Sequence, residues 1–262
     1  MSDHFIDLHN WFATPSGRYL LAWERAQLDL AVADIFGFHA LQLGMPELPG
    51  LASNRMSHRW LATQVPTAGA AFVTDFSALP FPANSLDLVL LPHALELASD
   101  PHTTLREVER VLVPEGRVVI CGLNPASLWG LRQRRAHLYH RLGWGKLFLP
   151  EANDFIGYWR LRDWLRLLGF EVEVARFGCY RPALSSEKWL QYFSWMDRVG
   201  ARWWPILGAL YFLVAVKRVR GMTLLSPAWK TAKIPAIAPV SVANSAILTK
   251  AGAINDIDSW ES

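Results

Sequence analysis

Cysteine is scarce in this chain: the two that occur, Cys121 and Cys179, lie far apart and form no C-x-x-C pair. Paired cysteines are what a disulfide framework or a structural zinc site requires, so we expect neither and predict no metal. We therefore expect a reducing, cytoplasmic compartment. Charge imbalance is also small, with a formal net charge of +3, which is too little by itself to indicate nucleic-acid binding.

Long hydrophobic runs are missing as well, and we expect no export signal. Residues 1–13 contain Asp3 and Asp7 and lack the basic start and apolar centre of a signal peptide. The most apolar stretch, Trp203–Val216, is interrupted by Pro205 and Gly208 and is shorter than the about 20 residues that a membrane helix needs. We interpret this stretch as a buried strand with its lead-in loop and predict no transmembrane segment.

Hydrophobic residues are abundant, at 52% of the chain, so a large core can be buried. The 13 tryptophans are many for this length. Core and lid packing is the preferred interpretation, and an aromatic substrate pocket is the alternative.

The first 75 residues predict one helix and three strands. Thr14-Pro15 is typical of a helix start, and apolar residues follow at helical spacing until Gly37. Ala40–Leu43 predicts a strand that runs into a loop at Gly44. A short strand is expected near residues 60–62, and a clearer one at residues 70–73, which ends at Thr74-Asp75.

The next segment alternates strand, helix and strand. Leu86–Leu91 is almost wholly apolar, as expected for a parallel strand buried on both faces. Asp100-Pro101 predicts a helix start, Pro114–Gly116 a turn, and Val118–Cys121 another buried strand. This rhythm indicates an open, mostly parallel sheet.

The remaining residues are harder to interpret. Residues 122–159 look irregular, after which we expect a helix that ends at Gly169 and a strand at residues 171–177. A further helix, with Trp189 on its inner face, should start at Ser185 or Ser186, and Ala209–Val216 should form the last strand. We predict one domain over residues 1–221 and a flexible extension over residues 222–262, which has three prolines and no period.

Two segments contain specific sequence motifs. Residues 75–89 read DFSALPFPANSLDLV, and residues 105–116 read LREVERVLVPEG. They resemble two patterns of the class I S-adenosylmethionine (SAM) methyltransferases, D-A-x-x-L-P-F-x-D-x-S-F-D-x-V and L-x-E-x-x-R-V-L-K-P-G-G. The resemblance is closest to the branch of the ubiquinone and menaquinone C-methyltransferases and the biotin-pathway methyltransferase, and it extends over roughly residues 20–220.

The resemblance implies a fold and a cofactor. The fold is the Rossmann-like α/β methyltransferase fold, a mostly parallel seven-stranded sheet with an antiparallel last strand and helices on both faces. The implied cofactor is SAM, with Asp75 accepting from the adenine amino group and Phe76 contacting the ring. Pro92 and His93 would border the methyl group and the acceptor.

The loop after the first strand departs from the family signature D/E-x-G-x-G-x-G. Residues 42–50 read QLGMPELPG, so Gln42 stands at the position of the acid. Gly44, Met45 and Gly50 are the candidates for contacts with the amino-acid part of SAM, and Glu47 is a candidate substitute for the missing carboxylate.

A second departure concerns the acid that holds the ribose hydroxyls in this family. No Asp or Glu occurs between Ser53 and Gln64, where Gln64 or Asn54 could form neutral hydrogen bonds instead. Replacing one charge-assisted hydrogen bond by a neutral one costs about 1–2 kcal/mol, or about tenfold in affinity.

The candidate catalytic residues are His93, Glu96 and Asn124. A neutral His93 could act as a general base near the acceptor, although a structural role is equally expected, and Glu96 is a weaker candidate for the same task. Asn124 either lines the acceptor site or forms a turn. Asp75 likewise has a local alternative, capping of its own loop.

The basic run Arg132–Lys146 lies where the family places a substrate-side insert, here residues 122–159. It could contact an anionic substrate, nucleic acid or an acidic membrane surface, but a solvated helix face is the preferred interpretation. We expect a SAM-dependent methyltransferase with a small or medium-sized acceptor. The alternative is an inactive descendant used for binding or scaffolding, and a Rossmann dehydrogenase is disfavoured because no G-x-G-x-x-G follows the first strand.

Overall fold

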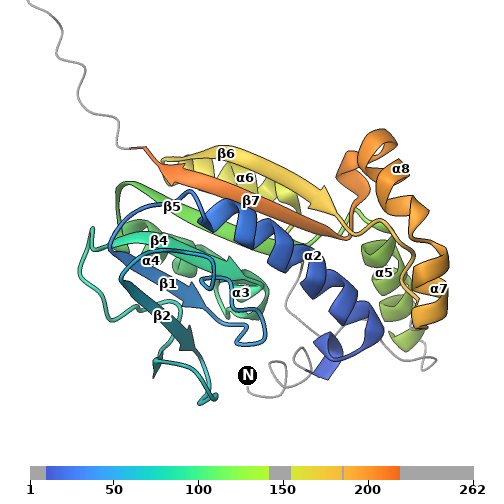
Figure 1. Cartoon of the computed structure of the whole chain (residues 1–262), viewed down its shortest axis with the longest axis horizontal. Coiled ribbons are helices and arrows are strands. Elements are labelled where there is room, and N and C mark those ends of the chain that lie inside the picture. The colour runs from blue at the N-terminus through green and yellow to red at the C-terminus, as the bar shows by residue number, and fades with distance from the viewer. Residues whose placement is uncertain (1–9, 142–154, 185, 219–262) are drawn as a thin grey trace, which may run out of the picture. The chain divides into compact units, whose positions relative to one another are not determined.

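The computed structural model describes residues 10–141, 155–184 and 186–218. A seven-stranded sheet in the order β3-β2-β1-β4-β5-β7-β6 runs through them, with helices on both faces (Figure 1). This arrangement confirms the predicted methyltransferase-like sheet. The extension predicted for residues 222–262 and the basic residue Lys146 lie outside the described residues.

Four parallel strands form the first half of the sheet. They are β1 (His39–Leu43), β2 (His58–Thr63), β3 (Phe72–Val73) and β4 (Leu86–Pro92), and their pairing is parallel throughout. All four predicted strands are confirmed, although β2 is longer and β3 shorter than expected. Six of the seven residues of β4 are buried, because helices cover both faces of this central strand.

Strand β5 (Leu112–Leu123) is longer than the predicted strand and includes the expected turn at Pro114–Gly116. The register with β4 changes from Leu86↔Leu112 to Leu88↔Arg117, so extra residues bulge out of β5. Glu115 adopts a positive φ of 64° in this bulge. The turn predicted at Pro114–Gly116 is therefore corrected to a bulge within β5.

The last two strands are β6 (Phe170–Gly178) and β7 (Leu210–Lys217). Strand β7 lies antiparallel between β5 and β6, as predicted for the last strand. All eight residues of β7 are buried, which explains the apolar composition of this segment. No described helix is long and apolar enough to cross a membrane.

Helices α2 (Pro15–Val32) and α4 (Pro101–Val111) begin as predicted. The side chain of Thr14 accepts a hydrogen bond from the backbone N–H of Gly17, and that of Asp100 accepts from the N–H groups of His102 and Thr103. Helix α2 ends five residues before Gly37. The short helix α3 (Ala94–Leu97) follows β4 directly.

Helix α5 (Leu128–Arg141) corrects the prediction that residues 122–159 are irregular. Residues 142–154 lie outside the described part. The predicted helix before Gly169 is α6 (Tyr158–Leu167), with Leu161 and Leu165 buried.

Two short helices, α7 (Glu187–Tyr192) and α8 (Trp195–Trp203), replace the single helix predicted after Ser186. Trp189, which was predicted to face inward, is exposed, and its neighbour Leu190 is the buried residue of α7. A 3-10 turn, η1 (Pro205–Leu207), leads into β7.

The core has two layers, one on each face of the sheet. Leu88 and Leu90 of β4 pack in the layer that contains Leu20 and Leu28 of α2. Val89 and Leu91 point to the opposite face, into the layer that contains residues of α4 and α6. The parallel strands β1, β2 and β4 therefore end at one edge of a well-packed sheet, and ligands bind beyond such edges in open α/β folds.

Candidate functional site

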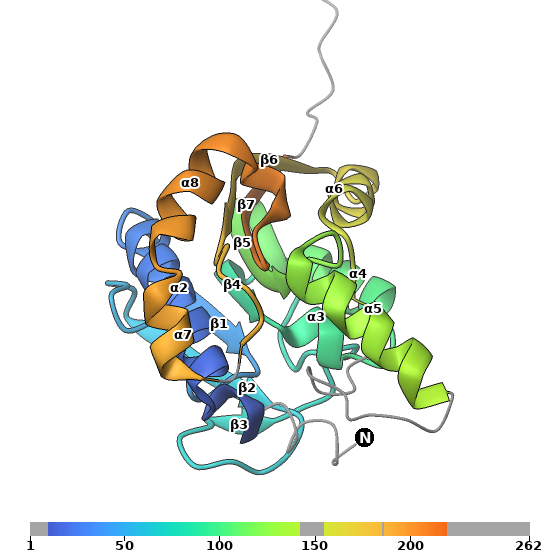
Figure 2. The same ribbon diagram turned by 90° about the vertical axis from the view of Figure 1, so that its right-hand side faces the viewer.

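The carboxyl ends of the parallel strands face the viewer in Figure 2, with α3, α5 and α7 around them. Gly44 follows β1, Asp75 follows β3 and Pro92 ends β4. The predicted cofactor residues therefore lie along one edge of the sheet, as expected from their spacing.

Gln42 holds the loop after β1 together from inside. Its Nε2 donates to the carbonyl oxygens of Gly44, Met45 and Leu48 at 3.1, 3.0 and 2.8 Å. Its Oε1 accepts from the N–H of Gly50 at 3.0 Å. The side chain is buried, and a carboxylate could not make the three donor contacts. Gln42, which replaces the family acid, therefore suits this loop, because the loop turns its carbonyl oxygens towards the Gln42 amide.

The loop also has an unusual backbone. Gly44 and Met45 both adopt positive φ angles, of 76° and 50°, and the side chain of Met45 is buried. A methyl group placed on Gly44 would lie 3.6 Å from the ring of Phe76. The loop after β1 and the residues after β3 are therefore direct neighbours.

Asp75 and Phe76 differ sharply in exposure. Asp75 is exposed, and its Oδ1 accepts from the N–H of Ser77 at 2.9 Å, so the carboxylate does cap its own loop. Phe76 is buried. The local role of Asp75 uses one carboxylate oxygen, and its exposure leaves the group accessible to a ligand.

Two polar groups considered for the ribose flank β2: Asn54 lies before the strand begins and Gln64 follows its end. Asn54 is buried, and its Nδ2 donates to the carbonyl oxygens of Val32 and Ile35 at 2.8 and 3.0 Å. Its Oδ1 accepts from the N–H of Met56. Asn54 is therefore occupied in closing the end of α2, whereas Gln64 is half-buried directly after β2.

A charged cluster that the sequence analysis did not identify lies at the end of β4. His93 Nδ1 lies 2.7 Å from Glu96 Oε2, and His93 Nε2 lies 2.7 Å from Glu24 Oε1. Glu96 Oε1 accepts from the N–H of Leu123 at 2.5 Å. We call Glu24, His93 and Glu96 the buried triad. No described group of His, Cys, Asp and Glu residues has the arrangement of a metal site.

The triad is completely enclosed. The side chains of Glu24 and His93 have no solvent exposure and that of Glu96 has 2%. The ring of Phe12 lies 5.2 Å from that of His93. Glu24 Oε2 has no hydrogen-bond partner among the described residues. The sequence feature that could have indicated the triad is Glu24, an acid that lies between Leu20 and Leu28 on the apolar face of α2.

The charge state of His93 corrects the general-base hypothesis. Burial alone would lower the pKa of His93, but the carboxylates of Glu24 and Glu96 outweigh burial and raise it to about 10. The ring is therefore protonated at neutral pH, with both nitrogens bonded to carboxylates. A neutral, accessible imidazole, on which the hypothesis depended, is absent at this position, and Glu96 is committed to the same cluster.

Asn124 has a structural role after β5. Its Nδ2 donates to the carbonyl oxygens of Ile206 and Gly208 at 2.7 and 2.9 Å, and its Oδ1 accepts from the N–H of Ala126. It joins the start of α5 to the turn before β7. Of the two alternatives for Asn124, these contacts support the turn.

The basic run begins on α5. Arg132, Arg134 and Arg135 are exposed, whereas Gln133 is buried. The side chains beyond residue 136 in this run lie outside the described part. The exposed arginines agree with a solvated helix face, and helix α5 lies at the same end of the sheet as the candidate site (Figure 2).

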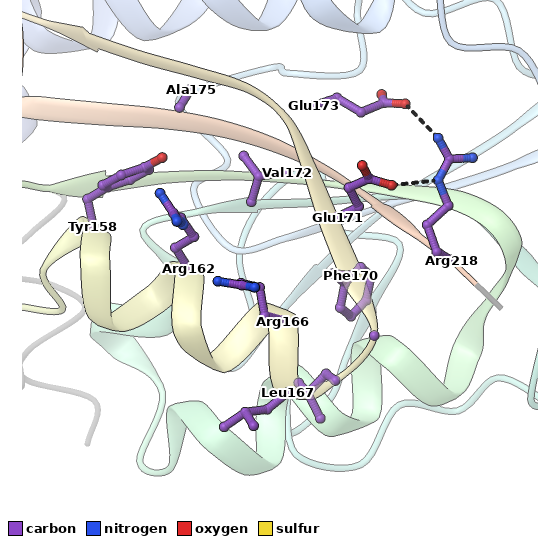
Figure 3. A pocket seen from close by; sticks show the side chains of 12 residues that line it. Tyr158, Arg162, Arg166, Leu167, Phe170, Glu171, Val172, Glu173, Ala175 and Arg218 are labelled. Atoms are coloured by element: carbon purple, nitrogen blue, oxygen red, sulfur yellow. Dashed lines mark hydrogen bonds and ion pairs between the residues drawn. The ribbon is translucent and has the colours of Figure 1, made fainter. Parts of the chain in front are cut away.

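A groove of about 1050 Å³ lies away from this edge, between α6 and the edge strand β6. In Figure 3, Arg162 and Arg166 point into it from α6, and Arg218 pairs with Glu171 and Glu173 at its other end. Charged side chains along an exposed edge strand discourage pairing with other chains. The groove is separate from the candidate site.

Comparison with known proteins agrees with the geometry. The family described as "Methyltransferase domain" matches residues 52–120. A protein of Escherichia coli named YafS is 33% identical over 221 residues, which cover 82% of each chain.

Shorter matches are found with methyltransferases of named activity. A malonyl-[acyl-carrier protein] O-methyltransferase of Halorhodospira halophila is 45% identical over 58 residues, 22% of this chain and 20% of its own. A demethylmenaquinone methyltransferase of a Geobacillus species is 34% identical over 116 residues, 38% of this chain and 49% of its own. These matches confirm the resemblance to the menaquinone and biotin-pathway branch.

Among solved structures, a SAM-dependent methyltransferase of Archaeoglobus fulgidus superposes with a TM-score of 0.52 at 17% identity. The match covers 75% of this chain and 94% of that one. This structural similarity shows the fold, and the sequence similarities show the family. The chain therefore belongs to the class I SAM-dependent methyltransferase family.

Proposed function

We propose that this methyltransferase binds SAM at the carboxyl edge of β1, β3 and β4 and transfers its methyl group to a small or medium-sized acceptor. The observation that carries the proposal is the contact between the two predicted cofactor loops. Gly44 of the first loop lies against Phe76 of the second, beside the exposed carboxylate of Asp75.

The adenine end of the proposed site fits the residues present. Asp75 keeps an exposed carboxylate that can accept from an exocyclic amine, and the buried ring of Phe76 supplies an apolar wall. An acceptor beside an apolar surface is a suitable arrangement for reading the edge of a base.

The methionine end has a different electrostatic arrangement from the family pattern. Gln42 provides no charge, and its amide is fully used by the loop. The buried triad next to Pro92 has two carboxyl groups for one imidazolium. Excess negative charge at this end of β4 favours a cationic ligand such as the sulfonium and ammonium of SAM.

The chemistry places few demands on individual side chains. When bound, SAM supplies an activated methyl group, and its transfer is an in-line displacement in which positioning contributes much of the rate. We assign positioning roles to Gly44, Met45, Gly50 and Pro92. His93 supports the end of β4 through its contacts with Glu24 and Glu96. We assign no general base.

Calorimetric titration with SAM and with S-adenosylhomocysteine tests the proposal. We expect binding of both, and about tenfold weaker binding after Asp75→Ala, since one charge-assisted hydrogen bond is lost. Asp34→Ala is the matched control, because Asp34 is an exposed aspartate beyond the end of α2. Unchanged affinity in Asp75→Ala would refute the adenine assignment.

The second candidate is a protein that kept the fold for binding or scaffolding and lost efficient SAM binding. Gln42 favours it, because its amide fills the interior of the loop where the family has an acid. Absence of detectable binding up to millimolar SAM would support this candidate and exclude the first.

A further inference from the structure

An exposed aromatic surface covers one end of the molecule. Nine of the fifteen exposed large hydrophobic side chains in the described residues come from the start of α5 and from residues 187–207, which form α7, α8 and η1. Five of them are aromatic, namely Trp189, Tyr192, Trp195, Trp203 and Trp204. Trp203 is 70% exposed and Tyr192 is 69% exposed. These four exposed tryptophans therefore do not serve the core packing that the number of tryptophans suggested.

Several of these residues lie next to one another. An apolar cavity of about 340 Å³ lies between Leu128 of α5 and Trp195, Val199 and Trp204 of the α8 region. Trp189 and Tyr192 of α7 lie edge to face, with ring centroids 5.9 Å apart. Figure 2 shows α5, α7 and α8 at the same end of the sheet. Single exposed apolar residues are ordinary, but a concentration of large exposed aromatic residues at one end of the molecule is typical of an interaction surface.

Positive charge surrounds the aromatic residues. Lys188, Arg198 and Arg202 are exposed on α7 and α8, and Arg134 and Arg135 are exposed on α5. Among the described residues, no acid pairs with Lys188, Arg198 or Arg202.

The acids of α7 and α8 do little to offset these cations. Asp197 is turned inward, where it accepts from Tyr19 Oη at 2.5 Å and pairs with Arg181 at 2.8 Å. Glu187 is the one exposed acid among residues 186–207. The surface is thus both aromatic and net positive.

We propose that this surface docks onto an anionic lipid bilayer. Tryptophan and tyrosine rings suit the boundary between headgroups and acyl chains, where one side of the ring is apolar and the other is wet. Arginine and lysine side chains reach from the same surface to anionic headgroups. The cations favour this partner over a second copy of the chain, because two copies of the surface would bring like charges together.

Cosedimentation of the full chain with lipid vesicles tests the proposal. We expect binding to vesicles that contain phosphatidylglycerol, weak binding to pure phosphatidylcholine, and release at high salt. Each removed cation should weaken binding about fivefold. The charge variant Arg198→Glu/Arg202→Glu and the aromatic variant Tyr192→Ser/Trp203→Ser should therefore both lose most of the binding.

Matched controls separate the surface from general effects. Trp159→Ser removes an exposed tryptophan of α6, and Arg106→Glu reverses an exposed arginine of α4, and both should bind as wild type does. Circular dichroism should show that all four variants are folded. Wild-type binding by the folded surface variants, or no binding to either vesicle, would overturn the proposal. A dimer that only the aromatic variant dissociates, without lipid binding, would assign the surface to self-association instead.

Discussion

The Nε2 atom of His93 lies 2.7 Å from Oε1 of Glu24, which joins the end of β4 to the middle of α2 across 69 residues of sequence. Removing one partner of a buried ion pair leaves the other charge unpaired. Glu24→Ala should therefore lower the free energy of unfolding by about 3–5 kcal/mol, measured by urea denaturation. Arg25→Ala, one residue along on the exposed face of α2, should change it by less than about 0.5 kcal/mol. Equal effects of the two substitutions would show that the triad does not stabilise the fold.

The raised pKa of His93 makes stability depend on pH. Its pKa of about 10 in the folded protein exceeds the ordinary value of 6.5, because two carboxylates outweigh burial. Its contribution is fully present below pH 6.5 and is lost as the pH rises towards 10. The free energy of unfolding should therefore fall by about 1.4 kcal/mol per pH unit within this window.

The interval from about pH 7 to 8 isolates His93. Burial raises the pKa of the Cys121 and Cys179 thiols too, and these groups add a loss of the same sign at higher pH. The double variant Glu24→Gln/Glu96→Gln should show a shallower slope. Nitrogen-15 spectra of the imidazole at pH 8 should show both ring nitrogens protonated, and a neutral ring would contradict the assignment.

Gln42→Glu would restore the family acid, yet we expect it to damage the loop. The carboxylate would face the carbonyl oxygens of Gly44, Met45 and Leu48, which now accept from Nε2. Leaving these buried acceptors unsatisfied should cost about 1–3 kcal/mol of unfolding free energy, measured by urea denaturation. Unchanged stability together with tighter SAM binding would mean that the loop adapts readily to an acid.

Gln64→Glu should have the opposite outcome. Gln64 is half-buried directly after β2, where the family has an acid for the ribose hydroxyls. If the proposed site is correct, a carboxylate there should raise SAM affinity by about tenfold, measured by calorimetry. Asn54→Asp serves as the comparison, because the buried Asn54 is committed to Val32 and Ile35 and should lose stability without gaining affinity.

The parts of the fold that local pattern determines were predictable from sequence. The apolar run of β4 and the Asp100-Pro101 start of α4 are signals of that kind, and both are confirmed. Helix α5 was missed because its arginines and leucines form no clear apolar stripe. Trp189 was placed inward because one continuous helix was assumed, whereas the chain breaks between α7 and α8.

The candidate site was predictable to a smaller extent. The family motif at residues 75–89 identified Asp75 and Phe76 as candidates, because that motif is short and continuous in sequence. The buried triad depends on three residues that only the tertiary fold brings together, and the pKa of His93 depends on that assembly. The donor contacts of Gln42 could not be foreseen either, because they follow from where three loop carbonyls point.

The position of β7 has a consequence for synthesis on the ribosome. This strand pairs with β5 on one side and β6 on the other, and Lys217 at its end donates to the carbonyl oxygens of Glu109 and Leu112. Strand β6 therefore has no neighbour in the sheet until β7 has been translated. The nascent chain must expose apolar strand surface until residue 217 leaves the exit tunnel, and a chaperone that covers such surfaces would be needed most in that interval.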